Sequence, residues 1–288
     1  SWTASNIILQ NGATLAVQVG SSSPYFTSAD IGTLLGMTSS ATGGFETGST
    51  LALDTTPGNF TYSAGIANAY SGSTLGITKL GANALTLTNA NTYTGPTNVN
   101  AGTLALGTTG EALNNTAITV RNGATLAAVP STGSMSIGSA GGASLTLSGG
   151  STLLLGGNSA GSAETTTFNT LTLNGNLSIG GSGAPADLTF DLDNTSNDEL
   201  LVTGAISFGA GGGVINIIVP SSSTAPVGAS LSYILVTAAG GLASGAGDLT
   251  LGTGSQIIAL GSNQYIATLG TSGVGGTEET LNLTKVSL

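Results

Sequence analysis

The acidic side chains between residues 187 and 199 are the main concentration of chemically capable groups in this chain. The segment DLTFDLDNTSNDE holds Asp187, Asp191, Asp193, Asp198 and Glu199. Hard cations prefer such oxygen ligands, and Asp191, Asp193 and Asp198 are the candidate calcium ligands. The segment lacks the central Gly and the final Glu of an EF-hand loop. The alternative is a turn between strands expected at 188–192 and 199–203, in which Asp and Asn side chains bond to the backbone.

The same carboxylates could serve as the acid pair of a glycosidase or a polysaccharide lyase. Glycoside hydrolysis needs two carboxylates across a sugar subsite, and such sites normally add aromatic platforms or, for a lyase, a basic residue. Phe190 and Phe208 fit strand cores better, and the whole chain has only three basic residues. His and Cys are absent, which removes the Ser-His triad and thiolate metal sites. We therefore expect no enzyme activity, no catalytic residues and no cofactor beyond the calcium considered above.

Charge is scarce throughout the chain. Charged residues make up 6% of it, and its net charge is −10 with Lys79, Arg121 and Lys285 as the only basic residues. Without a basic patch we expect no nucleic-acid binding, and the negative balance disfavours anionic membranes. Apolar residues alternate with polar ones, so we expect no membrane insertion. The first residue is Ser1 rather than Met, as expected for a mature exported form or a fragment.

Short phrases of alternating apolar and hydroxyl residues recur along the chain. IILQNGATLAV at 7–17 returns as ITVRNGATLAA at 118–128, with looser copies at 145–155 and 171–179. Each phrase is typical of a strand, an Asn-Gly or Gly-Gly turn and a second strand, because these dipeptides supply positive φ. The alternation places Leu and Ile on one face and Thr and Ser on the other. Imperfect copies of a strand-turn unit predict an all-β fold of the β-solenoid type.

One helix is expected near residues 27–37, in the segment TSADIGTLLGM. Thr27 or Ser28 is the N-cap, and Ile31, Leu34 and Leu35 form an apolar stripe. Such a helix could cover the apolar end of a solenoid, and a plain surface loop is the alternative.

The length and apolar content of the expected strands divide the chain into three parts. Residues 1–75 are N-terminal rungs with the helix-bearing insert, and residues 76–186 are the central solenoid. Residues 187–288 have longer and more apolar strands, which indicates a hairpin-rich or sandwich-like C-terminal part.

Residues 79–107, KLGANALTLTNANTYTGPTNVNAGTLALG, resemble the autotransporter-associated β-strand repeat, also called the passenger-associated transport repeat. The residues that follow its pattern are Lys79, Gly81, Leu85, Leu87, Asn91, Tyr93, Gly95, Thr97, Val99, Gly102 and Leu104. Asn83, Asn89 and Pro96 depart from it. The resemblance implies a right-handed β-helix, secretion to the exterior or cell surface of a Gram-negative-type bacterium, and no catalytic residues.

Two functions remain open from the sequence. The first is an extracellular structural protein that self-assembles, head-to-tail, through strand edges and solenoid ends into a fibre or surface layer. Scarce charge favours it, because charge is what usually keeps β edges apart. The alternative is a passenger-type adhesin that binds glycans or another surface. The expected assembly residues lie near the two termini and are Trp2, Ile7, Leu9, Leu281, Leu283 and Val286.

Overall fold

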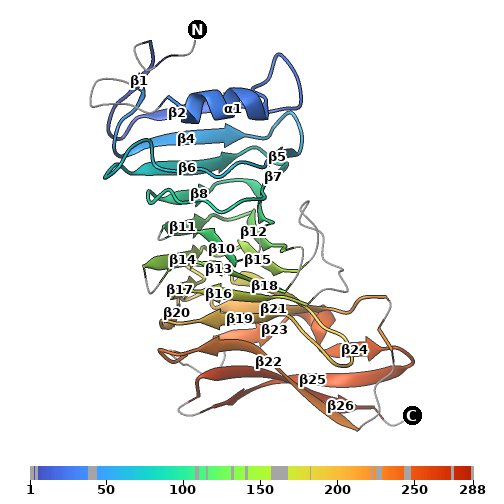
Figure 1. The fold of residues 1–288 in the computed structure, drawn as a ribbon. Coiled ribbons are helices and arrows are strands. Elements are labelled where there is room, and N and C mark those ends of the chain that lie inside the picture. Colours follow the sequence, from blue (N-terminus) through green and yellow to red (C-terminus); the bar gives the residue numbers. More distant parts are fainter. Residues whose placement is uncertain are drawn as a thin grey trace.

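The computed structural model is a stack of β coils that begins beside one helix and ends in an antiparallel sheet (Figure 1). It describes residues 3, 6–37, 44–107, 110–114, 116–130, 133–139, 142–156, 168–181, 183–221, 223–224, 229–242, 248–273 and 276–286. Within these residues the strands form three eight-stranded sheets and one two-stranded sheet. The predicted all-β solenoid is thereby confirmed.

The first two long sheets run along the stack, and each takes one strand from each successive coil. The first sheet has the order β2 (Thr14–Gln18), β4 (Ser49–Asp54), β6 (Leu75–Leu80), β8 (Thr97–Val99), β11 (Ala117–Val120), β14 (Ala143–Leu147), β17 (Gly175–Ile179) and β20 (Ile206–Phe208). The second has the order β5 (Phe60–Tyr62), β7 (Ala84–Leu87), β9 (Gly102–Leu106), β12 (Ala124–Ala128), β15 (Thr152–Leu155), β18 (Ala186–Asp191), β21 (Gly213–Ile218) and β23 (Leu249–Leu251).

The third sheet starts later in the chain and changes character at its end. Its order is β10 (Gly110–Leu113), β13 (Ser134–Ile137), β16 (Thr170–Leu173), β19 (Glu199–Val202), β22 (Ser230–Ala238), β26 (Glu278–Lys285), β25 (Asn263–Ser272) and β24 (Ile257–Leu260). The strands pair in parallel as far as β22, and β22, β26, β25 and β24 pair antiparallel. A 3₁₀ turn at Thr253–Ser255 precedes β24. The predicted hairpin-rich C-terminal part is confirmed.

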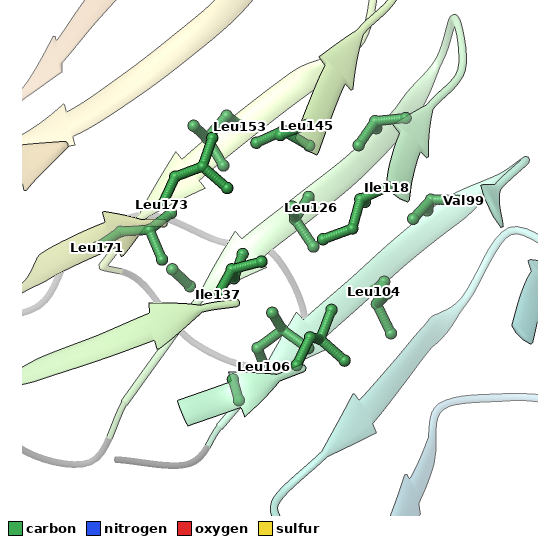
Figure 2. Close-up of a cluster of buried hydrophobic side chains, with 14 of the residues drawn as sticks. Val99, Leu104, Leu106, Ile118, Leu126, Ile137, Leu145, Leu153, Leu171 and Leu173 are labelled. Carbon is green, nitrogen blue, oxygen red and sulfur yellow. The ribbon is translucent and has the colours of Figure 1, made fainter. Parts of the chain in front are cut away.

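Parallel register stacks like side chains from coil to coil in the core. In the second sheet a buried aliphatic column consists of Leu85, Leu104, Leu126, Leu153, Leu188 and Ile215. Figure 2 shows part of it, with Leu104, Leu126 and Leu153 beside Ile118 and Leu145 of the first sheet. Alternation along each strand turns these residues inward because successive side chains point to opposite faces of a sheet. One hydrophobic core cluster extends from Leu9 to Leu283, so the three parts named from the sequence share a core. Their boundaries stay a prediction.

The Asn-Gly turns of the recurring phrases carry the chain from one sheet to the next. Asn122 and Gly123 separate β11 of the first sheet from β12 of the second, and Gly123 has φ +74°. The Asn122 side chain donates from Nδ2 to the Gly149 carbonyl of the following coil at 2.9 Å. The turn is therefore a corner of the solenoid and does not pair its two flanking strands.

The expected helix is α1 (Ser28–Leu35), at the N-terminal end of the stack beside β2 (Figure 1). Thr27 is its N-cap and forms a capping box with Asp30. Ile31 and Leu34 are buried, and the Ser28 Oγ donates to the Thr61 carbonyl of β5 at 3.1 Å. A second element at this end is the parallel pair β1 (Ile8–Leu9) and β3 (Gly44–Phe45), whose Leu9 and Phe45 join the core. Both elements contribute to closing the first coil.

Candidate functional site

Asp191 and Asp198 are buried together at a corner of the solenoid. Asp191 ends β18, Asp198 precedes β19, and the exposed fraction of each side chain is 0%. The Asp198 Oδ1 accepts the backbone N–H of Asn169 at 2.8 Å, and its Oδ2 accepts that of Asp191 at 2.8 Å. The Oδ2 atoms of both carboxyls lie 2.7 and 2.8 Å from where a Cβ on Gly156 would be. The corner is thus joined to the preceding coil, which contains Asn169 and Gly156.

Burial raises the pKa of Asp198 to about 7. The backbone hydrogen bonds from Asp191 and Asn169 lower this pKa, and the neighbouring charge of Asp191 raises it. Two carboxylates in one buried site resist simultaneous ionisation. We therefore expect the corner to keep a proton up to near-neutral pH.

Asp193, the third candidate calcium ligand, bonds within its own turn. Its Oδ1 accepts the N–H of Thr195 at 2.7 Å, the Thr195 hydroxyl at 3.1 Å and the N–H of Ser196 at 2.8 Å. This is the Asx-type turn that the sequence offered as the alternative interpretation. In the part of the chain that the structure describes, no three acidic groups converge in a way that could hold a metal ion. Calcium binding by this segment stays a hypothesis.

Lys79 is a buried cation whose hydrogen bonds connect two successive coils. Its exposed fraction is 0%, and its Nζ donates to the carbonyls of Leu80 and Gly81 at 2.8 Å and of Ala101 at 3.0 Å. Ala101 belongs to the following coil, so the ammonium group bridges successive corners. Burial lowers the pKa of Lys79 to about 8, and the negative charge of Asp54 opposes this change. The role visible in these contacts is structural.

Asn91 joins three successive coils through its side-chain amide. The Oδ1 accepts the backbone N–H of Ile66 at 3.0 Å, and the Nδ2 donates to the Ala112 carbonyl at 3.0 Å and to the Asn89 carbonyl at 2.7 Å. Ile66 precedes Asn91 by one coil and Ala112 follows it by one. With an exposed fraction of 2%, this amide supplies partners to backbone groups that cannot reach water.

A chain of buried hydroxyl groups near Asn91 in the sequence also connects neighbouring coils. The Tyr93 hydroxyl lies 2.7 Å from the Thr97 Oγ1, which lies 3.2 Å from the Thr116 Oγ1. Thr116 in turn donates to the Gly95 carbonyl at 2.5 Å. All three hydroxyl side chains have exposed fractions of 0%. These three hydroxyl groups therefore hold neighbouring coils together and are shielded from solvent.

Leu281 and Leu283, two of the expected assembly residues, lie on an internal strand and not on a free edge. Their strand, β26, pairs with β22 on one side and β25 on the other. Leu281 and Leu283 are core residues with exposed fractions of 0% and 1%. Val286 follows β26 and donates its N–H to the Gln264 carbonyl at 2.9 Å. The strand is internal because the β24–β25 hairpin, which precedes it in sequence, packs outside it.

The expected N-terminal assembly residues are also largely turned inward. Leu9 is buried with an exposed fraction of 7%, and the half-buried Ile7 packs against the same core. Ile8, between them, is 53% exposed. Trp2 lies outside the described residues. Leu9 and Ile7 therefore belong to the hydrophobic core at this end of the solenoid.

An unprotected strand edge occurs at β24. Among the described residues no strand pairs with its outer side. Ile257 of β24 stands opposite Ile266 of β25, and these side chains are 60% and 52% exposed. Neither β24 nor β25 contains an ionisable acidic or basic residue, although natural edges are commonly protected by charge, Pro or bulges. The sequence around β24, SQIIALG, predicts a short apolar strand. It does not show that this strand lies at the edge of the sheet.

These features define an elongated β-solenoid whose coils are tied by buried polar side chains. Residues 77–106, from within β6 to the end of β9, match the family model of the passenger-associated-transport-repeat. The chain thus carries the repeat that its sequence resembles, and the repeat points to a secreted or surface protein of the autotransporter-passenger type. A search of curated proteins found no match to the chain. No helix among the described residues has the length and apolar character needed to cross a membrane.

Proposed function

We propose that the chain is a non-enzymatic, extracellular structural protein that associates with copies of itself into a fibre or surface layer. The passenger-type repeat supports export of the chain. The hydrogen bonds between successive coils support a rigid, rod-like molecule. The partner in this proposal is the chain itself, without nucleic acid, cofactor or membrane insertion. The proposal includes head-to-tail growth. Its contacts then form between the two ends of the solenoid, where the expected apolar assembly residues are largely buried.

The observation that carries the proposal is the exposed apolar surface of the β24–β25 hairpin, whose two strands contain no Asp, Glu, Lys or Arg. Ile257 and Ile266 face outward on neighbouring strands, and Ile234 of β22 is 40% exposed on the same sheet. Elsewhere the chain carries a net charge of −10, which keeps copies apart at long range. Exposed apolar residues next to an unpaired edge favour association in which water is removed from both.

Binding of glycans is the second candidate. An open groove between the 194–197 turn and β22 is lined by amide and hydroxyl side chains that suit sugar hydroxyl groups, including Asn194, Asn197 and Ser232. Its aromatic lining residue, Tyr233, is only 7% exposed and donates its hydroxyl to the Asp193 carbonyl at 2.9 Å. The groove therefore lacks the stacking ring that sugar sites normally offer, so self-association is the better supported function.

The test compares Ile257→Lys with Ile8→Lys, two exposed apolar positions near opposite ends of the chain. Light scattering and electron microscopy at neutral pH should show assemblies larger than dimers for the parent protein, and Ile8→Lys reports separately on a head-to-tail contact at the N-terminal end. Ile257→Lys should reduce these assemblies strongly, because a lysine on the edge opposes pairing. A parent protein that stays monomeric at high concentration would overturn the proposal.

A further inference from the structure

We propose that β24 pairs antiparallel with β24 of a second copy of this chain across a twofold axis. The proposal rests on the self-association proposed above and assigns it a surface and a register. It begins from the backbone. β24 pairs with β25 through Ile257–Ile266, Ile258–Tyr265, Ala259–Gln264 and Leu260–Asn263. Its other side has no strand partner within the described part of the chain, so backbone groups there are available to an added strand.

Alternation of the side chains limits the register of such a pair. Ile257 and Ala259 are exposed, whereas Ile258 and Leu260 have exposed fractions of 3% and 0%. Residues directly opposite each other in an antiparallel pair lie on the same face of the sheet, and a slip by one residue would turn the buried set outward. The twofold axis must therefore lie midway between one residue and the same residue of the second copy. An axis that lies between two successive residues would pair an exposed residue with a buried one. Residue 257, 258 or 259 then faces its own copy, because an axis at residue 260 would place Ala259 opposite Gly261, a turn residue with φ +55°.

The space beside β24 fits an added apolar strand. An open groove of about 360 Å³ is lined on one side by Ile257, Ile258 and Ala259 and on the other by Ile217, Val219 and Pro220. Ser221, Ser223, Gly254 and Gly261 complete the lining, and the surface of the groove is more polar than apolar. Apolar side chains of a second β24 would lose contact with water there, as the twofold relation brings the same groove to both copies.

The charge distribution favours a second copy as the occupant. Each chain carries a net charge of −10, so most approaches between two copies bring like charges together. The β24–β25 hairpin has no ionisable acidic or basic side chain, and it meets its own copy without desolvating a charge. A twofold pair of this kind is closed. A fibre or layer then requires a second contact elsewhere on the dimer.

The experiment uses cysteine, which the native chain lacks. Three variants of the full chain are oxidised under mild conditions: Ile257→Cys, Ala259→Cys and the double variant Ile257→Cys/Ala259→Cys. A disulfide needs Cβ atoms within ~4.5 Å, which directly opposite residues approach. An axis at residue 257 or 259 links the corresponding single variant. An axis at residue 258 links only the double variant, through residue 257 of one copy and residue 259 of the other.

Controls separate this surface from other contacts. Thr284→Cys lies on the inner strand β26, exposed but away from the edge, and Ile8→Cys lies at the other end of the chain. We expect covalent dimers from at least one β24 variant, at least tenfold above both controls. Dimers without larger assemblies would support the β24 pair and contradict the fibre or layer. Larger assemblies in which no β24 variant forms a disulfide would overturn the β24 pair and leave the proposed function standing.

Discussion

Asp191 donates its backbone N–H to the Oδ2 of Asp198 at 2.8 Å, so one buried acidic residue is fixed by the main chain of another. The two residues flank a turn, and the Asp198 carboxyl also accepts the Asn169 N–H of the preceding coil. The arrangement stabilises a corner and places two carboxyl groups where water does not reach. Its consequence is a dependence of folding on pH.

We expect the free energy of unfolding to fall as pH rises from about 4 to 7. Burial raises the pKa of Asp198 from 3.8 to about 7 and that of Glu279 from 4.5 to about 7. The folded state therefore binds more protons than the unfolded chain across this window, so its stability is greatest below the unfolded pKa values and is lost toward the folded ones. A tenfold difference in proton affinity between the two states corresponds to about 1.4 kcal/mol. Urea titrations at several pH values measure the fall.

Glu279→Gln tests the share of one group in that fall. The amide keeps the shape of the side chain but has no titrating proton, so the decrease between pH 4 and 7 should become smaller. Glu278→Gln on the adjacent, half-buried residue is the matched control for removing one negative charge from the same strand. Equal slopes for Glu279→Gln and the parent would contradict the assignment.

Lys79→Met should destabilise the fold by about 2–4 kcal/mol. The thioether keeps most of the apolar stem but leaves the buried carbonyls of Leu80, Gly81 and Ala101 without the ammonium donor. Lys285→Met, at an exposed lysine, should change the free energy of unfolding by less than about 0.5 kcal/mol. Chemical denaturation followed by circular dichroism compares the two. Equal midpoints would show that the Lys79 contacts add nothing.

Gly95→Ala should destabilise the fold by about 1–3 kcal/mol, because it forces two coils apart. A Cβ at Gly95 would lie within 2.7 Å of the main chain at Leu75 and Gly76. Gly58→Ala is the control, since a Cβ at Gly58 meets nothing within 4 Å. Thermal unfolding should separate the two variants by several degrees. A Gly95→Ala protein as stable as Gly58→Ala would mean that the coils adjust without cost.

Local features of the sequence predicted much of the fold. Alternation identified the inward face of strands such as β9 and β12, since side-chain direction follows from position along a strand. Thr27 and Asp30 marked the start of α1 because their groups cap one another within a single turn. The transport repeat was recognisable for the same reason: its Gly, Asn and Lys positions meet fixed demands of the corners.

The candidate sites depended on relations that run between distant segments. Asp191 and Asp198 could be grouped together from the sequence, but their burial against Asn169 and Gly156 needed the packed coils. The hydroxyl chain from Tyr93 to Thr116 crosses from one coil to the next, and sequence spacing does not show which coils adjoin.

By itself, the sequence determined an all-β solenoid and its transport repeat, because both depend on side-chain alternation or turn chemistry over a few residues. It offered the helix near residues 27–37 with a surface loop as the alternative, and the structure has the helix. Tertiary structure alone decided which strand is outermost. β26 ends the described strands in sequence yet lies inside the sheet, and β24 lies at its edge. The physical reason is that antiparallel order is set by which strands bury their apolar faces against the last coil. Ile257 and Leu281 are both aliphatic residues of strands in this sheet, and Ile257 is exposed while Leu281 is buried for that reason.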